Sequence, residues 1–272
     1  MLPRTYLFVP GNRPERFDKA LASGADAVVL DLEDAVAPAA KADARQAIAQ
    51  WAAQASAEAR QRIVVRINEA GAQAQHAQDL ALLRSTGLCT AMLAKAESPD
   101  QIHALTTAVP GLQLLALIES ARGLAAAQAV AATPGVCRLV FGTLDFALDL
   151  GLDISTHSDG LLMAASTLVL ASRLAGLPAP VGGVTPQLDD EARLLADLAW
   201  GQRLGLGAKL CVHPRQVAPI HRALAPDDDA ISWAQRVLAA DAASPGAAQL
   251  DGRMIDRPVV LQALRTLARA GL

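Results

Sequence analysis

The chain has 272 residues, of which 52% are hydrophobic and only 3% aromatic, and its formal net charge is −3. This length suffices for one large domain with a sizeable core. The weak charge supplies no broad basic field, and no apolar run reaches the ~18 residues of a membrane span, so we expect neither nucleic acid nor membrane as a partner.

Short apolar runs alternate with helical stretches along most of the chain. Eight runs have the length and composition of buried strands: 6–9, 27–31, 63–67, 91–94, 113–118, 138–141, 180–184 and 208–212. Helical stretches follow at 14–23, 39–57, 76–85, 99–108, 121–132, 158–175 and 189–204. This alternation predicts a parallel (β/α)₈ TIM barrel. A doubly wound open sheet is the alternative, but the turn at 10–13 lacks the glycine pattern of dinucleotide-binding folds.

The pattern changes after the eighth predicted strand. Two helical stretches, 229–243 and 258–270, flank a polar connector. We therefore expect residues 1–225 to form the barrel and residues 226–272 to form a C-terminal helical appendage.

The cysteines and the first residues bear on the compartment. Cys89, Cys137 and Cys211 lie far apart, each in or beside a predicted strand, so we expect buried reduced thiols rather than disulfides or zinc ligands. No signal-peptide pattern opens the sequence, which favours a cytoplasmic protein.

Two neighbouring apolar runs each lead into a carboxylate, Glu119 in one case and Asp145 in the other. A buried carboxylate costs free energy unless it is paired, and the carboxyl ends of all barrel strands meet at one mouth. A cation held between Glu119 and Asp145 would explain both acids. The alternative is that both are solvated or cap the helices that follow.

Further polar residues follow the predicted strands and would gather at the same mouth: Asn12, Arg13, Asp31, Glu33, Asp34, Arg66, Asn68, Lys95, Glu97 and His213. Each also has an ordinary interpretation; Asp31 and Asp34, for example, could cap a helix. Two carboxylates with open coordination suit Mg²⁺, whereas Zn²⁺ would need His or Cys. Arg66 could then grip a substrate carboxylate, and metal and arginine together would stabilise an enolate-like oxyanion.

A serine nucleophile is disfavoured. Ser155, His157 and Asp159 alternate along one predicted loop, and no Gly-x-Ser-x-Gly turn contains a serine.

Several sequence blocks resemble one known family. They are RTYLFVPG at 4–11, DAVVLDLEDAV at 26–36, RIN at 66–68, IES at 118–120, GTLD at 142–145 and DGRMIDRP at 251–258. In this order they resemble the citrate lyase β-chain-like family, within the superfamily of HpcH/HpaI aldolases and malyl-CoA lyases. The resemblance spans essentially the whole chain. It implies a (β/α)₈ barrel that binds Mg²⁺, assembles as a homotrimer or a multiple of it, and reversibly cleaves a 3-hydroxyacyl-CoA thioester into a 2-oxo acid and an acyl-CoA.

The resemblance also implies roles for residues of the barrel. Glu119 and Asp145 would hold the metal, and Glu119 would also contact the substrate. Arg66 would bind the substrate and take part in catalysis. Many relatives carry an acid where this chain has Leu144. Because successive strand residues face opposite ways, we expect this departure to alter the substrate rather than metal binding.

The resemblance also implies roles for residues near the two ends of the chain. Arg4, Asn12 and Arg13 lie where relatives contact the CoA moiety. Asp256 would act as acid or base in the mouth of a neighbouring subunit, with the appendage swapped onto or packed against that subunit.

Two other activities would use the same residues. One is a metal-dependent aldolase acting on pyruvate and a free aldehyde. The other is a citrate lyase β-type subunit that works on a carrier-bound citryl thioester. The sequence leaves open which acyl thioester is used (citramalyl, malyl, methylmalyl or citryl), which group is the base, and how many subunits assemble.

Overall fold

The computed structural model describes residues 2–244 and 248–272. The chain forms two compact units, Met1–Ile220 and His221–Leu272. The boundary falls after Ile220, whereas the sequence predicted it after residue 225.

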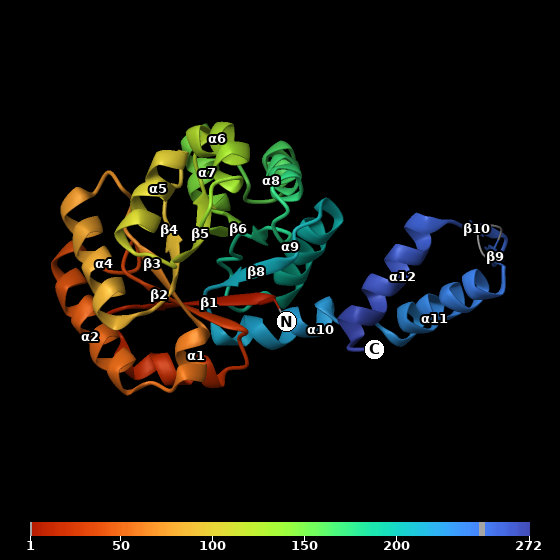
Figure 1. The fold of residues 1–272 in the computed structure, drawn as a ribbon, viewed down its shortest axis with the longest axis horizontal. Coiled ribbons are helices and arrows are strands. Elements are labelled where there is room, and N and C mark those ends of the chain that lie inside the picture. Colours follow the sequence, from red (N-terminus) through yellow and green to blue (C-terminus); the bar gives the residue numbers. More distant parts are fainter. Residues whose placement is uncertain (1, 245–247) are drawn as a thin grey trace. The chain divides into compact units, whose positions relative to one another are not determined.

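The first unit is a closed barrel of eight parallel strands, each paired with the next along the chain, with β8 paired to β1. The strands are β1 Thr5–Pro10, β2 Ala27–Asp31, β3 Ile63–Ile67, β4 Thr90–Leu93, β5 Gln113–Ile118, β6 Val136–Phe141, β7 Val181–Gly182 and β8 Ala208–Cys211. Helices surround the strands (Figure 1). The predicted (β/α)₈ barrel is confirmed.

The helices of the chain up to residue 224 are α1 Phe17–Ala22, α2 Lys41–Gln54, α3 Ala57–Gln61, α4 Gln73–Thr86, α5 Pro99–Ala108, α6 Ala121–Ala131, α7 Thr143–Leu150, α8 Leu162–Leu174, α9 Glu191–Leu204 and α10 Val217–Leu224. Four short 3₁₀ turns lie among them: η1 Pro14–Arg16, η2 Pro38–Ala40, η3 Asp159–Leu161 and η4 Pro214–Gln216. A membrane-spanning helix, judged by length and hydropathy, is not found among the described residues.

Alternation along the strands decides which charged residues reach the barrel interior. The interior core contains Val29 of β2, Val64 of β3 and Leu117 of β5. Because side chains on one face of a strand recur every second residue, the next inward positions are Asp31, Arg66 and Glu119. The strands therefore carry an apolar core up to their carboxyl ends and place charge directly above it.

Asp145 differs from its predicted place at a strand end. Strand β6 stops at Phe141, and α7 begins at Thr143, so Asp145 lies in the first turn of a helix. Of the apolar residues after Gly142, Phe146 and Ala147 lie on the buried face of α7, whereas Leu144 and Leu148 are exposed. The expectation that Leu144 and Asp145 face opposite ways as strand neighbours is therefore wrong.

Two further expectations need correction. The seventh strand is only Val181–Gly182, shorter than the predicted 180–184. Among the thiols, Cys211 is buried and Cys137 half-buried, but Cys89 is exposed, since it lies in the loop before β4. All three cysteines are free.

The second unit contains α11 Asp228–Ala243 and α12 Arg257–Ala270, which pack together. The predicted polar connector contains an antiparallel hairpin, β9 Ala248–Leu250 with β10 Arg253–Ile255. Its turn residues, Asp251 and Gly252, have φ of 50° and 74°, as a two-residue hairpin turn requires. The rest of the predicted connector, 245–247, lies outside the described residues.

Candidate active site

A cavity of about 350 Å³ opens at the carboxyl ends of the barrel strands. Charged residues from β2, β3, β5 and the start of α7 share this cavity with apolar residues. The lining residues are Phe8, Asp31, Asp34, Ala35, Arg66, Leu117, Glu119, Gly142, Thr143, Leu144, Asp145, Val184, Leu210 and Val212. The structure thus brings Arg66, Glu119 and Asp145 to one cavity.

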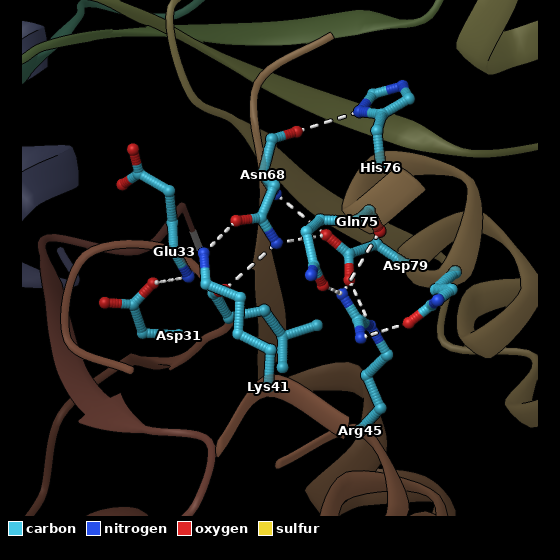
Figure 2. A network of polar contacts seen from close by, with 10 residues as sticks. Asp31, Glu33, Lys41, Arg45, Asn68, Gln75, His76 and Asp79 are labelled. Carbon is cyan, nitrogen blue, oxygen red and sulfur yellow. Dashed lines mark hydrogen bonds and ion pairs between the residues drawn. The ribbon is translucent and has the colours of Figure 1, made fainter. Parts of the chain in front are cut away.

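Asp31 and Arg66 form a bidentate ion pair across adjacent strands. The two residues are register partners of β2 and β3. Arg66 Nε donates to Asp31 Oδ1 at 2.8 Å, and Nη2 donates to Oδ2 at 2.6 Å. Asp31 also accepts the backbone N–H groups of Glu33 and Ala35 at 2.9 and 3.1 Å (the first is drawn in Figure 2). Asp31 is therefore an anchor for Arg66 and the following turn, and the alternative interpretation of Asp31 as a helix cap does not apply.

Glu33 is the second acid beside Arg66. Its Oε2 lies 2.7 Å from Arg66 Nη1, but this buried oxygen has no hydrogen-bond partner, so the contact is an ion pair only. Burial raises the pKa of Glu33 to about 7; the Arg66 charge opposes this shift, and Asp34 and Asp31 add to it. The guanidinium is thus held on three sides, and it packs over the Phe8 ring, 4.9 Å from the ring centroid.

Glu119 is buried and only partly satisfied. Its Oε1 accepts the backbone N–H of Lys95 at 2.8 Å, and Oε2 has no hydrogen-bond partner among the described residues. Lys95 has φ of 47°, an uncommon value for a residue other than glycine. Burial, opposed by the Lys95 N–H and reinforced by the charges of Glu33 and Asp145, raises the pKa of Glu119 to about 8.

The close approach of β6 to Glu119 depends on Gly142. A Cβ at this position would lie 2.5 Å from Glu119 Cβ and 2.6 Å from Oε2. Glycine therefore lets the carboxylate sit against the strand end. Asp145, three residues further on and half-buried, has neither a hydrogen bond nor an ion pair to another described residue. Asp34, which is exposed, also lines the cavity and has no hydrogen bond or ion pair among the described residues. The cavity thus contains three acidic groups with free oxygens, of which Glu119 is buried and Asp145 half-buried.

The structure does not bring every predicted residue to the cavity. Asn12 and Arg13 follow β1 at the correct end but are exposed, and Arg13 pairs with Glu15 at 2.7 Å. Arg4 precedes β1 and pairs with Asp26, which precedes β2, at 3.2 Å. Because the strands are parallel, Arg4 lies at the opposite end of the barrel from Asn12 and Arg13. The prediction that Arg4 lies beside these two residues is therefore wrong.

Two more predicted residues are accounted for by local structure. His213 Nδ1 accepts the backbone N–H of Arg215 at 3.2 Å and so caps η4. Asp256 belongs to the second unit, where its carboxylate accepts the backbone N–H of Val259 at 3.2 Å and caps α12. Asp256 is exposed.

The fold and the cavity define a class: a (β/α)₈ barrel with an arginine held by ion pairs and with unpaired carboxylates at its mouth, suited to binding an oxygen-rich anion and a hard cation. A sequence model of the HpcH/HpaI aldolase/citrate lyase family matches residues 4–214. The chain belongs to this family.

Relatives match nearly the whole chain. A citrate lyase subunit beta-like protein of Mycobacterium tuberculosis is 37% identical over 98% of this chain and 95% of its own length. A (3S)-malyl-CoA thioesterase of Cereibacter sphaeroides is 31% identical over 98% and 94%. Among solved structures, CitE from M. tuberculosis in complex with magnesium, acetoacetate and coenzyme A covers 99% of this chain and 98% of its own, with 36% identity and a TM-score of 0.88.

Proposed function

We propose that this protein is a Mg²⁺-dependent carbon–carbon lyase. It cleaves a 3-hydroxyacyl-CoA thioester, of the malyl or citramalyl kind, into a 2-oxo acid and an acyl-CoA. The observation that carries the proposal is the shared cavity, in which Glu119 and Asp145 keep free oxygens beside a preorganised Arg66. Magnesium and coenzyme A in the similar M. tuberculosis protein support it.

The donor set fits Mg²⁺. Among residues 2–244 and 248–272, no group of three or more His, Cys, Asp or Glu could enclose a metal. Glu119 and Asp145 would therefore hold the ion alone, with its other positions left to water and substrate oxygens, as is usual for Mg²⁺. When bound, the ion acts as a Lewis acid that stabilises negative charge on substrate oxygens.

The protein residues account for substrate orientation. Arg66 uses Nε, one N–H of Nη2 and the ion pair at Nη1 to hold its own position. Its remaining N–H groups are available to the substrate carboxylate. In the reaction the hydroxyl proton leaves and the bond between C2 and C3 breaks. The electron pair of this bond is taken up by the thioester as an enolate, and C2 of that enolate then takes up a proton.

The products distinguish the lyase from its rivals. The purified protein is incubated with Mg²⁺ and a panel of 3-hydroxyacyl-CoA thioesters, and both 2-oxo acid and free thiol are measured. The lyase releases 2-oxo acid and acyl-CoA without free thiol. Release of free CoA thiol and a hydroxy acid would instead show a thioesterase, and activity only with pyruvate and an aldehyde would show an aldolase. Activity confined to a carrier-bound citryl thioester would show a citrate lyase β-type subunit.

We propose further that Asp256 donates the proton at C2 in the mouth of a neighbouring copy, within a trimer or a multiple of it. Asp256→Asn should then lower kcat by roughly 10²–10⁴-fold, the usual contribution of a general acid or base, and leave Mg²⁺ affinity unchanged. Asp251→Asn, in the turn of the hairpin that precedes Asp256, is the control and should keep activity.

Mixing two inactive variants tests the transfer between copies. Oligomers reassembled from Asp256→Asn and Arg66→Lys chains contain some mouths that have both functional residues. Regained activity supports the proposal. If each variant is inactive and the mixture stays inactive after demonstrated subunit exchange, Asp256 does not act across subunits.

A further inference from the structure

A buried polar cluster lies beside the mouth, between β3 and the helices α2 and α4 (Figure 2). Its centre is Asn68, one residue beyond the end of β3 and buried. Asn68 Nδ2 donates to the backbone carbonyl of Leu32 at 3.0 Å. Leu32 is the residue between Asp31 and Glu33, so this hydrogen bond fixes the turn that supplies both acids around Arg66.

Asn68 is itself fixed by charged groups. Asp79 of α4, fully buried, accepts the Asn68 backbone N–H at 2.8 Å and the Nδ2 group at 2.7 Å through Oδ2. Its Oδ1 accepts Arg45 Nε at 2.6 Å. Lys41 Nζ donates to Asn68 Oδ1. Both N–H groups and the oxygen of the Asn68 amide are thereby used, which leaves its side chain one orientation.

The cluster has no direct access to the mouth. None of Arg45, Asn68 or Asp79 lines the cavity. Burying an ion pair such as Arg45–Asp79 contributes little net stability, because desolvation offsets the attraction. The hydrogen bond from Asn68 to the Leu32 carbonyl links this cluster to the turn that bears Asp31 and Glu33.

We infer that Asn68 is a positioning residue, and that Asp79 and Arg45 hold it so that the turn from Asp31 to Glu33 keeps Arg66 aligned. The inference rests on the proposed function only for its catalytic consequence. The physical part, that Asn68 fixes the turn, can be measured without substrate.

Asn68→Ala removes the side-chain bonds to Leu32, Asp79 and Lys41. It keeps the backbone N–H that Asp79 accepts, so Arg45 and Asp79 stay paired. Loss of the bond to the Leu32 carbonyl should raise amide exchange in residues 32–36 by about tenfold. It should lower kcat/KM by at least about tenfold through misalignment of Arg66. Lys41→Met removes only the contact of the half-exposed Lys41 side chain with Asn68 Oδ1. It should show the same changes at smaller amplitude, and it replaces Asn68→Ala as the test if that variant does not fold.

Gln75→Ala is the matched control. Gln75 Oε1 accepts Arg45 Nη2, so this variant removes a hydrogen bond from the same cluster at the end away from Leu32. It should lower the melting temperature without changing exchange in 32–36 or kcat/KM. If Gln75→Ala and Asn68→Ala lose equal activity, Asn68 is merely structural.

The two proposals fail in distinguishable ways. A wild-type protein inactive on every thioester overturns the proposed function, and hydrogen exchange alone then decides whether Asn68 fixes the turn. Unchanged exchange in Asn68→Ala overturns the inference. Faster exchange with wild-type kcat/KM also overturns it, because the turn would then not align catalytic groups.

Discussion

The two sides of the barrel mouth are built on opposite principles. On the side of β2 and β3, Arg66 is held by Asp31 through two hydrogen bonds and by Glu33 through an ion pair. On the side of β5 and β6, Glu119 has one backbone donor and Asp145 has no partner among the described residues. The first side holds its arginine by opposite charges without a ligand, and the second carries acidic groups that no cation of the protein pairs with among the described residues.

This difference separates orientation from ligand binding. Preorganised donors stabilise charge without having to move during a reaction, which suits the Arg66 side. Neighbouring carboxylates without a paired cation favour binding of a cation that would neutralise them, which suits the Glu119 side. The comparison therefore predicts that each side can be disabled without the other.

The largest effect is expected from Arg66→Lys. Lysine keeps the positive charge but lacks the planar fork that meets Asp31. We expect kcat/KM to fall roughly 10³-fold, as when a transition-state donor is lost, with Mg²⁺ affinity within a few-fold of wild type. Arg62→Lys, at the other end of β3, is the control for kinetics. Loss of Mg²⁺ binding in Arg66→Lys, measured by calorimetry, would show that the two sides form one unit.

Mg²⁺ affinity should depend on pH through Glu119. A metal ligand must be deprotonated, and the pKa of Glu119 is raised to about 8. The association constant should therefore rise by up to about tenfold per pH unit between pH 6 and 8, then level off. Glu119→Gln should bind Mg²⁺ about 10²-fold more weakly at pH 8 and lose this rise.

The same carboxyl group links stability to pH in the opposite direction. Without metal, the unfolded chain releases the Glu119 proton near pH 4.5 and the folded chain only near pH 8. The contribution of Glu119 to the free energy of unfolding is complete below pH 4.5 and is lost as pH rises through this window. Thermal unfolding from pH 5 to 9 should show a smaller decline for Glu119→Gln. Equal declines would contradict the raised pKa.

A smaller effect is expected from Gly142→Ala. The φ of Gly142 is −82°, which suits any residue, so only the added Cβ matters. That atom would displace Glu119, and we expect Mg²⁺ affinity to fall about tenfold with little change in fold. Gly71→Ala, whose Cβ would meet only Glu69 at 3.9 Å, should match wild type in calorimetry. Wild-type affinity in Gly142→Ala would show that Glu119 can move without loss.

Much of the fold follows from local sequence. The apolar runs give the strands, and alternation along β3 and β5 places Arg66 and Glu119 inward. Asp145 was assigned to the correct end of the barrel but to the wrong element. The predicted strand 138–141 ends where β6 ends. The sequence does not reveal that a helix begins directly after Gly142, because short apolar runs suit a buried strand and a buried helix alike.

The pairing of side chains could not be predicted in this way. The Asp31–Arg66 pair depends on the register of β2 against β3, which single-strand patterns do not specify. Arg45 and Asp79 look like surface charges on two helices, and only the packing of α2 against α4 buries them together. The position of Arg4 could have been predicted, since it precedes the first strand rather than following it.

The thiols offer a practical consequence. Burial raises the pKa of Cys137 to about 11 and of Cys211 to about 12, so neither reacts readily near neutral pH. Cys89 alone is exposed, in the loop before β4 and thus at the barrel end remote from the mouth. A maleimide dye should therefore label native protein once per chain, giving a fluorescent reporter of assembly that does not obstruct substrate entry.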